Sequence, residues 1–244
     1  MTPRMKNGCL ICGNIDRHLM THIETINGKE RVLCNKCGAI YFTDLPTTYP
    51  AYNKDYNDHF YRPGDIYKAG VMAAKVGFFC KKNISRAKLL EVGPGNGLTM
   101  YLLKEQGLNI EGIEIDINWA SWLTAHYAIT TFSGPFEKHT FEKKYDLIYS
   151  SHTIEHTACP LCFFRKCQEI LSNNGFLYID TPDARYYDTS PGRWHHFQTR
   201  HPFEHICILS HTALKKLAHR TDFNIIHFET HPEYGSFQAI LRKT

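Results

Sequence analysis

The sequence predicts an α/β fold in which a mainly parallel sheet ends in one antiparallel hairpin. From residue 66 onward, short apolar runs alternate with helical stretches, and this alternation is typical of parallel strands joined by helical crossovers. The last two apolar runs are separated only by a turn that contains Pro232 and Gly235, so they must pair antiparallel. Cysteine pairs near the N-terminus indicate a small additional module ahead of this fold.

The strands and helices are expected in a regular order along the chain. A helix over 66–82 leads into a strand over 88–92, where the run Lys-Leu-Leu-Glu-Val stops at glycines. The run Asn-Asn-Gly over 173–175 is expected to turn the chain into a strand over 176–180. The other expected strands cover 110–115, 129–132, 145–150, 223–229 and 237–242. The other expected helices cover 98–106, 119–127, 161–171 and 211–220.

Composition restricts the class of protein. Of 244 residues, 43% are hydrophobic and 21% are charged, which is ordinary for a globular chain with a buried core. The net charge of +4 is small and no Lys/Arg run is present, so nucleic acid is not favoured as a partner. No apolar run is long enough for a membrane span, and the N-terminus has no apolar signal segment. We therefore expect a cytoplasmic protein whose nine cysteines are thiols or metal ligands rather than disulfides.

Changes in composition divide the chain into three expected parts. Residues 1–45 are rich in Cys, Gly and polar turns and contain few apolar runs, so they need a metal or another cross-link to fold. Residues 46–64 form a connector rich in Tyr. Residues 65–244 carry the α/β pattern and form the main domain.

A glycine-rich loop follows the first expected strand. Residues 91–97 read Glu-Val-Gly-Pro-Gly-Asn-Gly, and a helix begins directly behind them. Glycines in that place let the backbone turn tightly and come close to a ligand. Glu114 ends the second strand, where a carboxylate can accept both hydroxyl groups of a ribose. A nicotinamide or flavin dinucleotide site is the alternative, but its Gly-x-Gly-x-x-Gly pattern would place a glycine where Leu98 stands.

The motifs over residues 88–243 resemble the class I S-adenosylmethionine-dependent methyltransferase family. EVGPGNG, GIEID, YDLIYSSHTIEH and LSNNGFLYIDTPD occur in the family's order, followed by the closing hairpin. The resemblance implies a Rossmann-like sheet of seven strands with the last two reversed, and it implies S-adenosylmethionine as cofactor. The residues that the resemblance assigns to the cofactor are Glu91, Gly93, Pro94, Gly95, Asn96, Gly97, Glu114, Ile115, Phe136 and Ser150.

By the same resemblance, each part of the cofactor has its own residues. The glycines wrap the methionine part, Glu114 binds the ribose, and Ser150 lies beside the cofactor at the end of the fourth strand. Ile115 and the backbone around Phe136 flank the adenine. Many members carry an Asp for the adenine amino group where this chain has Pro135, so adenine recognition is expected to depend on backbone groups and Phe136.

Two Cys-x-x-Cys pairs lie near the N-terminus, Cys9 with Cys12 and Cys34 with Cys37. Four thiolates at this spacing can converge on one tetrahedral zinc ion. Buried or redox-active thiols are the alternative, but redox pairs do not come matched around a segment without its own core. We expect a structural Zn²⁺, because four thiolates leave no coordination position open for water. Residues 1–45 are therefore expected to be a zinc-binding module.

The four-cysteine module, the Tyr-rich connector and this core together resemble a bacterial group of sugar and surface-polysaccharide methyltransferases, which includes deoxysugar C-methyltransferases. In that resemblance the module and the connector form a lid over substrate and cofactor. The remaining cysteines are expected to be packing thiols. They are Cys80, Cys159, Cys162, Cys167 and Cys207.

Histidines follow the fourth expected strand, over 145–150, and the fifth, over 176–180. Folds of this kind bind ligands at these strand ends. A hydroxyl or carbon nucleophile gains from a base that removes its proton, and His is the usual base near neutral pH. His152 and His156 come after the fourth strand. The sugar C-methyltransferases carry a Tyr-x-Glu-His element where this chain has Glu204 and His205, with Pro202 at the Tyr position.

We expect His205, oriented by Glu204, to be the catalytic base, with His152 and His156 as the alternatives. Each of these histidines could instead be a hydrogen-bonded structural residue. The missing Tyr partner favours methylation of oxygen over carbon.

The sequence as a whole predicts an S-adenosylmethionine-dependent methyltransferase that acts on a small molecule, a nucleotide-linked sugar or a surface-polysaccharide precursor. The alternative is an RNA-modifying enzyme that uses the zinc module as a nucleic-acid clamp, although basic and aromatic residues are not interleaved on one strand. A degenerate fold that only binds the cofactor product is a third hypothesis, and the intact glycine loop disfavours it. No membrane partner is expected, and the sequence does not define the oligomeric state.

Overall fold

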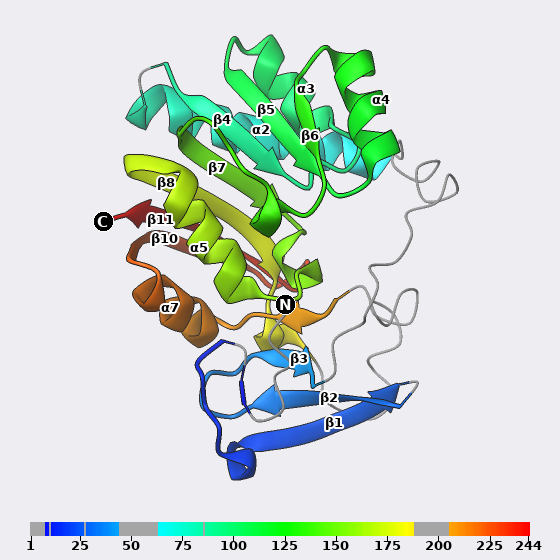
Figure 1. Cartoon of the computed structure of the whole chain (residues 1–244), viewed down its shortest axis with the longest axis vertical. Coiled ribbons are helices and arrows are strands. Elements are labelled where there is room, and N and C mark those ends of the chain that lie inside the picture. The colour runs from blue at the N-terminus through cyan, green and yellow to red at the C-terminus, as the bar shows by residue number, and fades with distance from the viewer. Residues whose placement is uncertain (1–7, 10, 27, 44–62, 85, 188–204) are drawn as a thin grey trace. The chain divides into compact units, whose positions relative to one another are not determined.

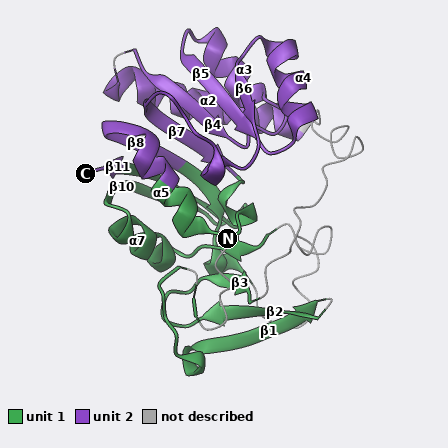
Figure 2. Ribbon diagram, in the orientation of Figure 1, with its two compact units in different colours: residues 1–50, 152–165, 179–241 green, residues 51–151, 166–178, 242–244 purple. Residues whose placement is uncertain are grey.

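A computed structural model of the chain describes residues 8–9, 11–26, 28–43, 63–84, 86–187 and 205–244. The strands among these residues form one sheet of seven strands and one sheet of four. The chain divides into two compact units, which Figure 2 shows in different colours. Unit 1 contains residues 1–50, 152–165 and 179–241, and unit 2 contains residues 51–151, 166–178 and 242–244. These units are defined by compactness alone and do not test the predicted domain boundaries. The division into a zinc-binding module, a connector and a main domain at residues 45 and 64 therefore stays a prediction.

The seven-stranded sheet has the order β10-β11-β8-β7-β4-β5-β6. Strand β4 pairs in parallel with β5 and with β7, and β5 pairs in parallel with β6. The neighbouring strands β10 and β11 form the closing antiparallel hairpin, which Figure 1 shows in orange and red. The bounds are Lys88–Val92 (β4), Asn109–Glu114 (β5), Thr131–Ser133 (β6), Tyr145–Ser151 (β7), Leu171–Pro182 (β8), Phe223–His231 (β10) and Ser236–Lys243 (β11). The predicted α/β class and the seven-stranded sheet with its reversed end are confirmed.

The strand order creates a natural ligand position in unit 2. The chain runs from β4 outward to β5 and β6, and then returns to β7 on the other side of β4. Open α/β sheets bind ligands at the carboxyl ends of strands where the order reverses in this way. The loop after β4 and the end of β7 therefore mark the expected binding edge.

The helices of the α/β part begin and end close to their expected positions. Asp116 accepts hydrogen bonds from the N–H groups of Asn118 (2.8 Å) and Trp119 (2.9 Å), and this N-cap starts α4 two residues earlier than the expected 119–127. Helix α2 contacts α3, and both α3 and α4 contact β5. The helices are α2 (Pro63–Asn83), α3 (Leu98–Glu105), α4 (Ile117–Tyr127), α5 (Pro160–Ile170) and α7 (His211–Arg220).

Strand β8 differs most from its expectation. It begins at Leu171, directly after α5, rather than at residue 176. The expected Asn-Asn-Gly turn lies inside this strand, where Asn174 has a positive φ of 61° that a short polar side chain tolerates. The turn signal therefore marks a local irregularity in the strand and not its start.

Unit 1 contains the four-stranded sheet, β1 (Met20–Ile26), β2 (Lys29–Cys34), β3 (Ile40–Phe42) and β9 (Cys207–Ile208), paired antiparallel in that order. The N-terminal strands are thus completed by two residues from the far end of the chain. Ile40 and Ile208 pack together with Ala184 in a small core of their own. Among the described residues, no helix has the length and apolar character needed to cross a membrane.

Candidate cofactor site, cysteine cluster and histidine cluster

The loop after β4 turns on glycines. Gly93, Gly95 and Gly97 have φ values of 68°, 54° and 72°, a left-handed conformation that favours glycine. A Cβ atom on Gly97 would lie 2.6 Å from Leu123 Cδ2 and 2.8 Å from Tyr127 Cε2, and both of these side chains are buried. Gly97 therefore serves both the turn and the close packing of the loop against α4.

Two aromatic side chains of α4 hold the loop in place. Trp119 Nε1 donates to the carbonyl of Gly95 at 2.6 Å, and the Tyr127 hydroxyl donates to the carbonyl of Asn96 at 3.2 Å. The Asn96 side chain accepts from the N–H of Leu98, the first residue of α3, at 3.0 Å. No motif marks Trp119 or Tyr127, so sequence reasoning missed both as supports of the loop.

Glu91 places an ionisable side chain inside the core of unit 2. It is 4% exposed, and its Oε2 is buried without a hydrogen-bond partner among the described residues. Burial raises the pKa of this carboxyl to about 8. A buried carboxyl without a partner is unfavourable, so a cationic group of a ligand beside the loop would fit it.

Glu114 ends β5 with its carboxylate orientation fixed. Its Oε1 accepts from the N–H of Ile115 at 2.7 Å and from the N–H of Asp116 at 3.4 Å. Burial raises the pKa of the carboxyl to about 7 against the effect of these two hydrogen bonds. Oε2 takes part in none of the hydrogen bonds found among the described residues, so this oxygen can accept from a ligand hydroxyl.

Three further predicted cofactor residues, Pro94, Phe136 and Ser150, are also buried. Phe136 is 6% exposed in a 3-10 helix over Phe136–Lys138. Ser150 is 2% exposed, and its hydroxyl donates to the carbonyl of Val92 at 3.4 Å. The glycine loop offers backbone groups to a ligand. Glu91 offers a partner for a cation, and Glu114 offers an acceptor for hydroxyls. This donor set fits S-adenosylmethionine, which carries an ammonium group and a ribose.

The four N-terminal cysteines lie in two matching turns of unit 1, one that begins at Cys9 and one that begins at Cys34. Each turn ends in a glycine with a φ of 71°, Gly13 and Gly38. The N–H of each glycine donates to the carbonyl of the first cysteine of its pair, at 2.9 and 2.6 Å. The glycines thus let each pair close into a tight turn.

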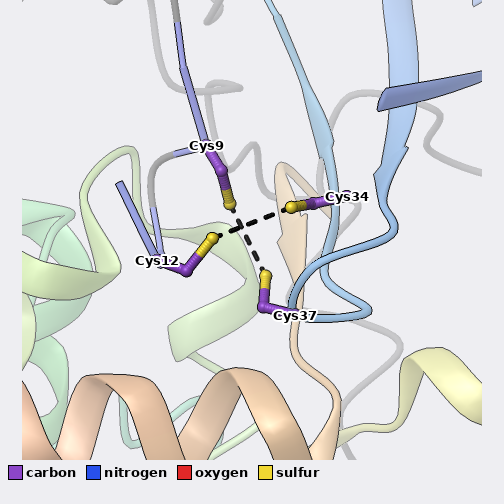
Figure 3. Close-up of side chains that lie close together, drawn as sticks. All are labelled: Cys9, Cys12, Cys34 and Cys37. Carbon is purple, nitrogen blue, oxygen red and sulfur yellow. Dashed lines mark hydrogen bonds between the residues drawn. The ribbon is translucent and has the colours of Figure 1, made fainter. Parts of the chain in front are cut away.

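Figure 3 shows the four sulfur atoms pointing toward one another. The sulfurs of Cys9 and Cys37 are 3.6 Å apart, those of Cys12 and Cys34 are 3.8 Å apart, and all four lie within 4.8 Å of one another. A tetrahedral ion with metal–sulfur bonds of about 2.3 Å would separate its sulfurs by about 3.8 Å. The hydrogen bond with Cys37 lowers the pKa of the Cys9 thiol to about 5, and the thiolate is the form that binds a metal. The cluster fits one tetrahedral metal ion.

Helix α7 holds both cysteine turns. The Ser210 hydroxyl caps α7 by accepting from the N–H of Ala213 at 3.0 Å, and it donates to the carbonyl of Cys37 at 2.5 Å. Near the other end of the helix, the Arg220 guanidinium donates to the carbonyl of Ile11. The cysteine turns are therefore supported by a helix that follows them by more than 170 residues.

The expectation that the other five cysteines are packing thiols is wrong for two of them. Cys159 and Cys162 form a disulfide at the start of α5, and this also corrects the expectation that no cysteine is oxidised. Spacing cannot distinguish a reduced pair from an oxidised one. The three others, Cys80, Cys167 and Cys207, are buried free thiols as expected.

The histidines gather around Glu155, a residue that no sequence motif marks as functional. Glu155 is fully buried, in the 3-10 helix over Ile154–His156. Its Oε1 lies 3.2 Å from His152 Nδ1 and 4.0 Å from His156 Nε2, and its Oε2 accepts from the Thr181 hydroxyl at 2.9 Å. Burial acts to raise the pKa of Glu155, but His152, His156 and His205 hold the pKa down at about 2. Glu155 is therefore an ionised anchor for the histidines.

His205 joins this cluster from the far end of the chain. Its ring lies 5.1 Å from the ring of His156, and the donor atoms of Glu155, His156 and His205 lie within 4.8 Å of one another. Burial lowers the pKa of His205 to about 4, although Glu155 opposes the shift. His152 has a positive φ of 49° and a side chain that is 43% exposed. Glu204 lies outside the described residues.

A Rossmann-like sheet of seven strands with a closing antiparallel hairpin, a glycine loop after β4 and an acid at the end of β5 is typical of class I methyltransferases. Residues 65–228 match the family described as "Methyltransferase domain". The chain therefore belongs to this methyltransferase family.

Solved structures of methyltransferases share the fold. The S-adenosylmethionine-dependent methyltransferase from Mesorhizobium loti superposes with a TM-score of 0.58 at 16% identity, over 71% of this chain and 99% of that one. The N-methyltransferase NodS from Bradyrhizobium japonicum, solved with S-adenosylhomocysteine, gives a TM-score of 0.55 at 11% identity, over 78% and 93% of the two chains. At these identities the likeness concerns the fold alone.

Two curated relatives are similar in sequence. Both are ubiquinone biosynthesis O-methyltransferases, from Actinobacillus pleuropneumoniae (28% identical over 105 residues) and Histophilus somni (26% over 109 residues). The matches span 38% and 40% of this chain, and only 45% and 46% of the relatives' own lengths.

Proposed function

We propose that the protein methylates a hydroxyl oxygen of a small molecule, and that the acceptor is a nucleotide-linked sugar or a surface-polysaccharide precursor. The observation that carries methyl transfer is the glycine loop with Glu91 and Glu114, placed at the binding edge of the sheet. The two curated O-methyltransferases support oxygen as the methylated atom. The four-cysteine cluster and the Glu204–His205 element support the sugar, since sugar methyltransferases carry similar features.

For the cofactor, we assign the backbone of Gly93–Gly97 to the methionine part and Glu91 to its ammonium group. Glu114 would bind the ribose through Oε2, while Ile115 and the backbone around Phe136 would flank the adenine. Ser150 would lie beside the cofactor with its hydroxyl turned to Val92. When bound, S-adenosylmethionine supplies a methyl group on a sulfonium that is open to in-line attack, so the protein acts mainly by positioning the two reactants.

Glu91→Gln is expected to weaken cofactor binding about 10-fold or more, because a hydrogen bond to a charged partner is worth about 1.5–3 kcal/mol. Without ligand, the folded protein keeps a proton on Glu91 up to about pH 8, whereas the unfolded chain releases it near its ordinary pKa. Glu91 should therefore make stability fall as the pH rises from about 4.5 to 8, by at most about 5 kcal/mol. Glu91→Gln should remove this contribution and leave the smaller one from Glu114, whose pKa is also raised. Thermal unfolding at several pH values and calorimetric titration with S-adenosylhomocysteine measure both effects.

Glu105→Gln is the matched control for Glu91, because Glu105 is an exposed carboxylate on α3. This variant should leave the cofactor affinity and the pH dependence unchanged. If Glu91→Gln bound S-adenosylhomocysteine as tightly as the wild type, Glu91 would have no part in the cofactor site.

For the metal, we propose one structural Zn²⁺ held by Cys9, Cys12, Cys34 and Cys37. The sulfur separations, the two glycine-ended turns and the support from α7 favour it. Four thiolates leave no position for water, so the ion would stabilise unit 1 and take no part in the chemistry.

For the base, we propose a histidine of the cluster around Glu155. His205, with its neighbour Glu204, is the first candidate. His152 and His156 are the alternatives. A neutral imidazole can accept the proton that the acceptor hydroxyl loses as the oxygen–carbon bond forms. The ionised Glu155 stabilises the imidazolium that results.

His205→Ala is expected to lower the rate constant about 10²–10⁴-fold and to leave cofactor affinity near the wild-type value. A base acts in its neutral form, so the rate should rise with pH through the pKa of His205, about 4, and this limb should be absent in the variant. Glu204→Gln should cost less, because it only loosens the orientation of the ring. Steady-state rates from pH 3.5 to 8 measure both.

His219→Ala is the control for His205, because His219 is exposed on α7, and it should behave as the wild type. If His205→Ala kept nearly the full turnover rate, His205 would not be the base, and His152 or His156 would be the candidate instead. A purely structural His205 would lower thermal stability and leave the acidic limb in place.

The acceptor is tested by incubation with labelled cofactor and a panel of acceptors, followed by mass spectrometry. The expected result is a mass increase of one methyl group on a sugar nucleotide. A ubiquinone precursor is the second candidate acceptor, because of the curated relatives. Its methylation would overturn the assignment of a sugar as acceptor and would agree with oxygen as the methylated atom. Methylation of RNA, with binding that weakens steeply as salt increases, would favour a nucleic-acid substrate.

A further inference from the structure

One cysteine pair, in the run Cys159-Pro160-Leu161-Cys162, differs from the other cysteines in its oxidation state. All nine cysteines of the chain lie among the described residues, and only this pair is joined in a disulfide. The four N-terminal cysteines face one another in their own cluster. Cys80, Cys167 and Cys207 are buried, and burial raises the pKa of each thiol, which makes them poor nucleophiles.

We propose that Cys159 and Cys162 form a thiol–disulfide exchange site, which takes a dithiol as reductant and cycles between the disulfide and two thiols. The pair lies wholly in unit 1 and belongs neither to the cofactor residues nor to the cysteine cluster. The proposal is therefore independent of the assigned acceptor, cofactor contacts and base.

Access and local geometry support exchange at this pair. Both cysteines are half-buried and not enclosed, so an external thiolate can reach them. Cys159 directly precedes Pro160, the first residue of α5, and its sulfur accepts from the N–H of Cys162 at 3.2 Å. No acidic side chain lies in the first turn of α5. The helix N-terminus and this N–H therefore stabilise a thiolate on Cys159.

The exchange balances as a two-electron step. A thiolate of the dithiol attacks Cys162 Sγ, the sulfur–sulfur bond breaks, and Cys159 leaves as the stabilised thiolate. The second thiol of the reductant then attacks the mixed disulfide, which frees Cys162 and closes the reductant into its own disulfide. Two electrons and two protons pass from the dithiol to the protein. The 3-10 helix with Glu155 and His156 lies just ahead of Cys159 in the chain, so the change occurs next to the histidine cluster.

The test uses the full-length protein as purified, with dithiothreitol as the probe. Native protein is equilibrated with graded ratios of reduced and oxidised dithiothreitol, quenched in acid, denatured and labelled with N-ethylmaleimide. Peptide mass spectrometry should show the 159–162 peptide passing from no label to two labels in one step, and returning when oxidised dithiothreitol is added. Peptides with Cys80, Cys167 and Cys207 should be labelled at every ratio.

Two results would overturn the proposal. Two labels at every ratio would mean that the pair does not form the disulfide, and no label except after unfolding would mean a closed structural bond. Single variants add an independent readout. In Cys162→Ser, the free Cys159 should react with iodoacetamide at pH 7 at least about 10-fold faster than the free Cys162 of Cys159→Ser. Equal rates would contradict the stabilised Cys159 thiolate.

Discussion

Cys34→Ser combined with Cys37→Ser is expected to release the metal and unfold the N-terminal part of unit 1. A structural zinc contributes about 10–16 kcal/mol to the folding of a small cysteine module, so its loss should unfold this segment. The wild-type protein should contain one zinc per chain by elemental analysis. In the double variant, zinc should be absent and residues 11–43 should become sensitive to protease.

Cys80→Ser is the control for this loss. Cys80 is as deeply buried in α2 as Cys34 is in its turn, but it lies outside the cysteine cluster, so the variant should keep its zinc. A wild-type protein that holds no metal and still protects residues 11–43 from protease would contradict a structural zinc.

Gly95→Arg is expected to abolish cofactor binding. Gly95 has a φ of 54°, and Trp119 fixes its carbonyl at 2.6 Å, so the loop cannot move away to make room for a long side chain. The arginine would occupy the space where the backbone approaches the cofactor. S-Adenosylhomocysteine at 100 times its dissociation constant should stabilise the wild type by about 2.7 kcal/mol, and this stabilisation, measured by thermal unfolding, should disappear in the variant.

Gly107→Arg separates strain from lost contact. Gly107 also has a positive φ, of 83°, and a Cβ there would meet nothing within 4 Å. The two variants therefore share the backbone penalty of a non-glycine residue at positive φ, but only Gly95 lies in the glycine loop. Gly107→Arg should lose some stability and keep the full response to S-adenosylhomocysteine. An equal loss of response in both variants would mean that strain alone explains the effect.

Elements with a clear periodic pattern and distinct ends could be predicted closely. Strand β4 keeps its expected bounds of 88–92, because an apolar run meets Gly93. Helix α7 keeps its expected bounds of 211–220, because Ser210 caps its start. The two cysteine pairs also come together as expected. The Cys-x-x-Cys spacing encodes the tight turn within each pair.

Features that depend on contacts between distant segments could not be predicted. The two residues of β9 carry no periodicity, and they become a strand only by pairing with β3. Glu155 becomes the centre of the histidine cluster because Thr181 and His205 reach it from later segments. Trp119 was expected only as a helix residue, and its hydrogen bond to Gly95 depends on how α4 lies against the loop. The predicted roles of the cofactor residues and of the histidines stay predictions.

Calorimetric titration of the wild-type protein with S-adenosylhomocysteine, and separately with NAD, tests the central claim most directly. Glu91, the glycine loop and Glu114 offer a partner for an ammonium group and an acceptor for ribose hydroxyls, and Leu98 stands where a dinucleotide site would have its third glycine. We expect one S-adenosylhomocysteine per chain and no heat of binding with NAD. Binding of NAD without binding of S-adenosylhomocysteine would contradict the account.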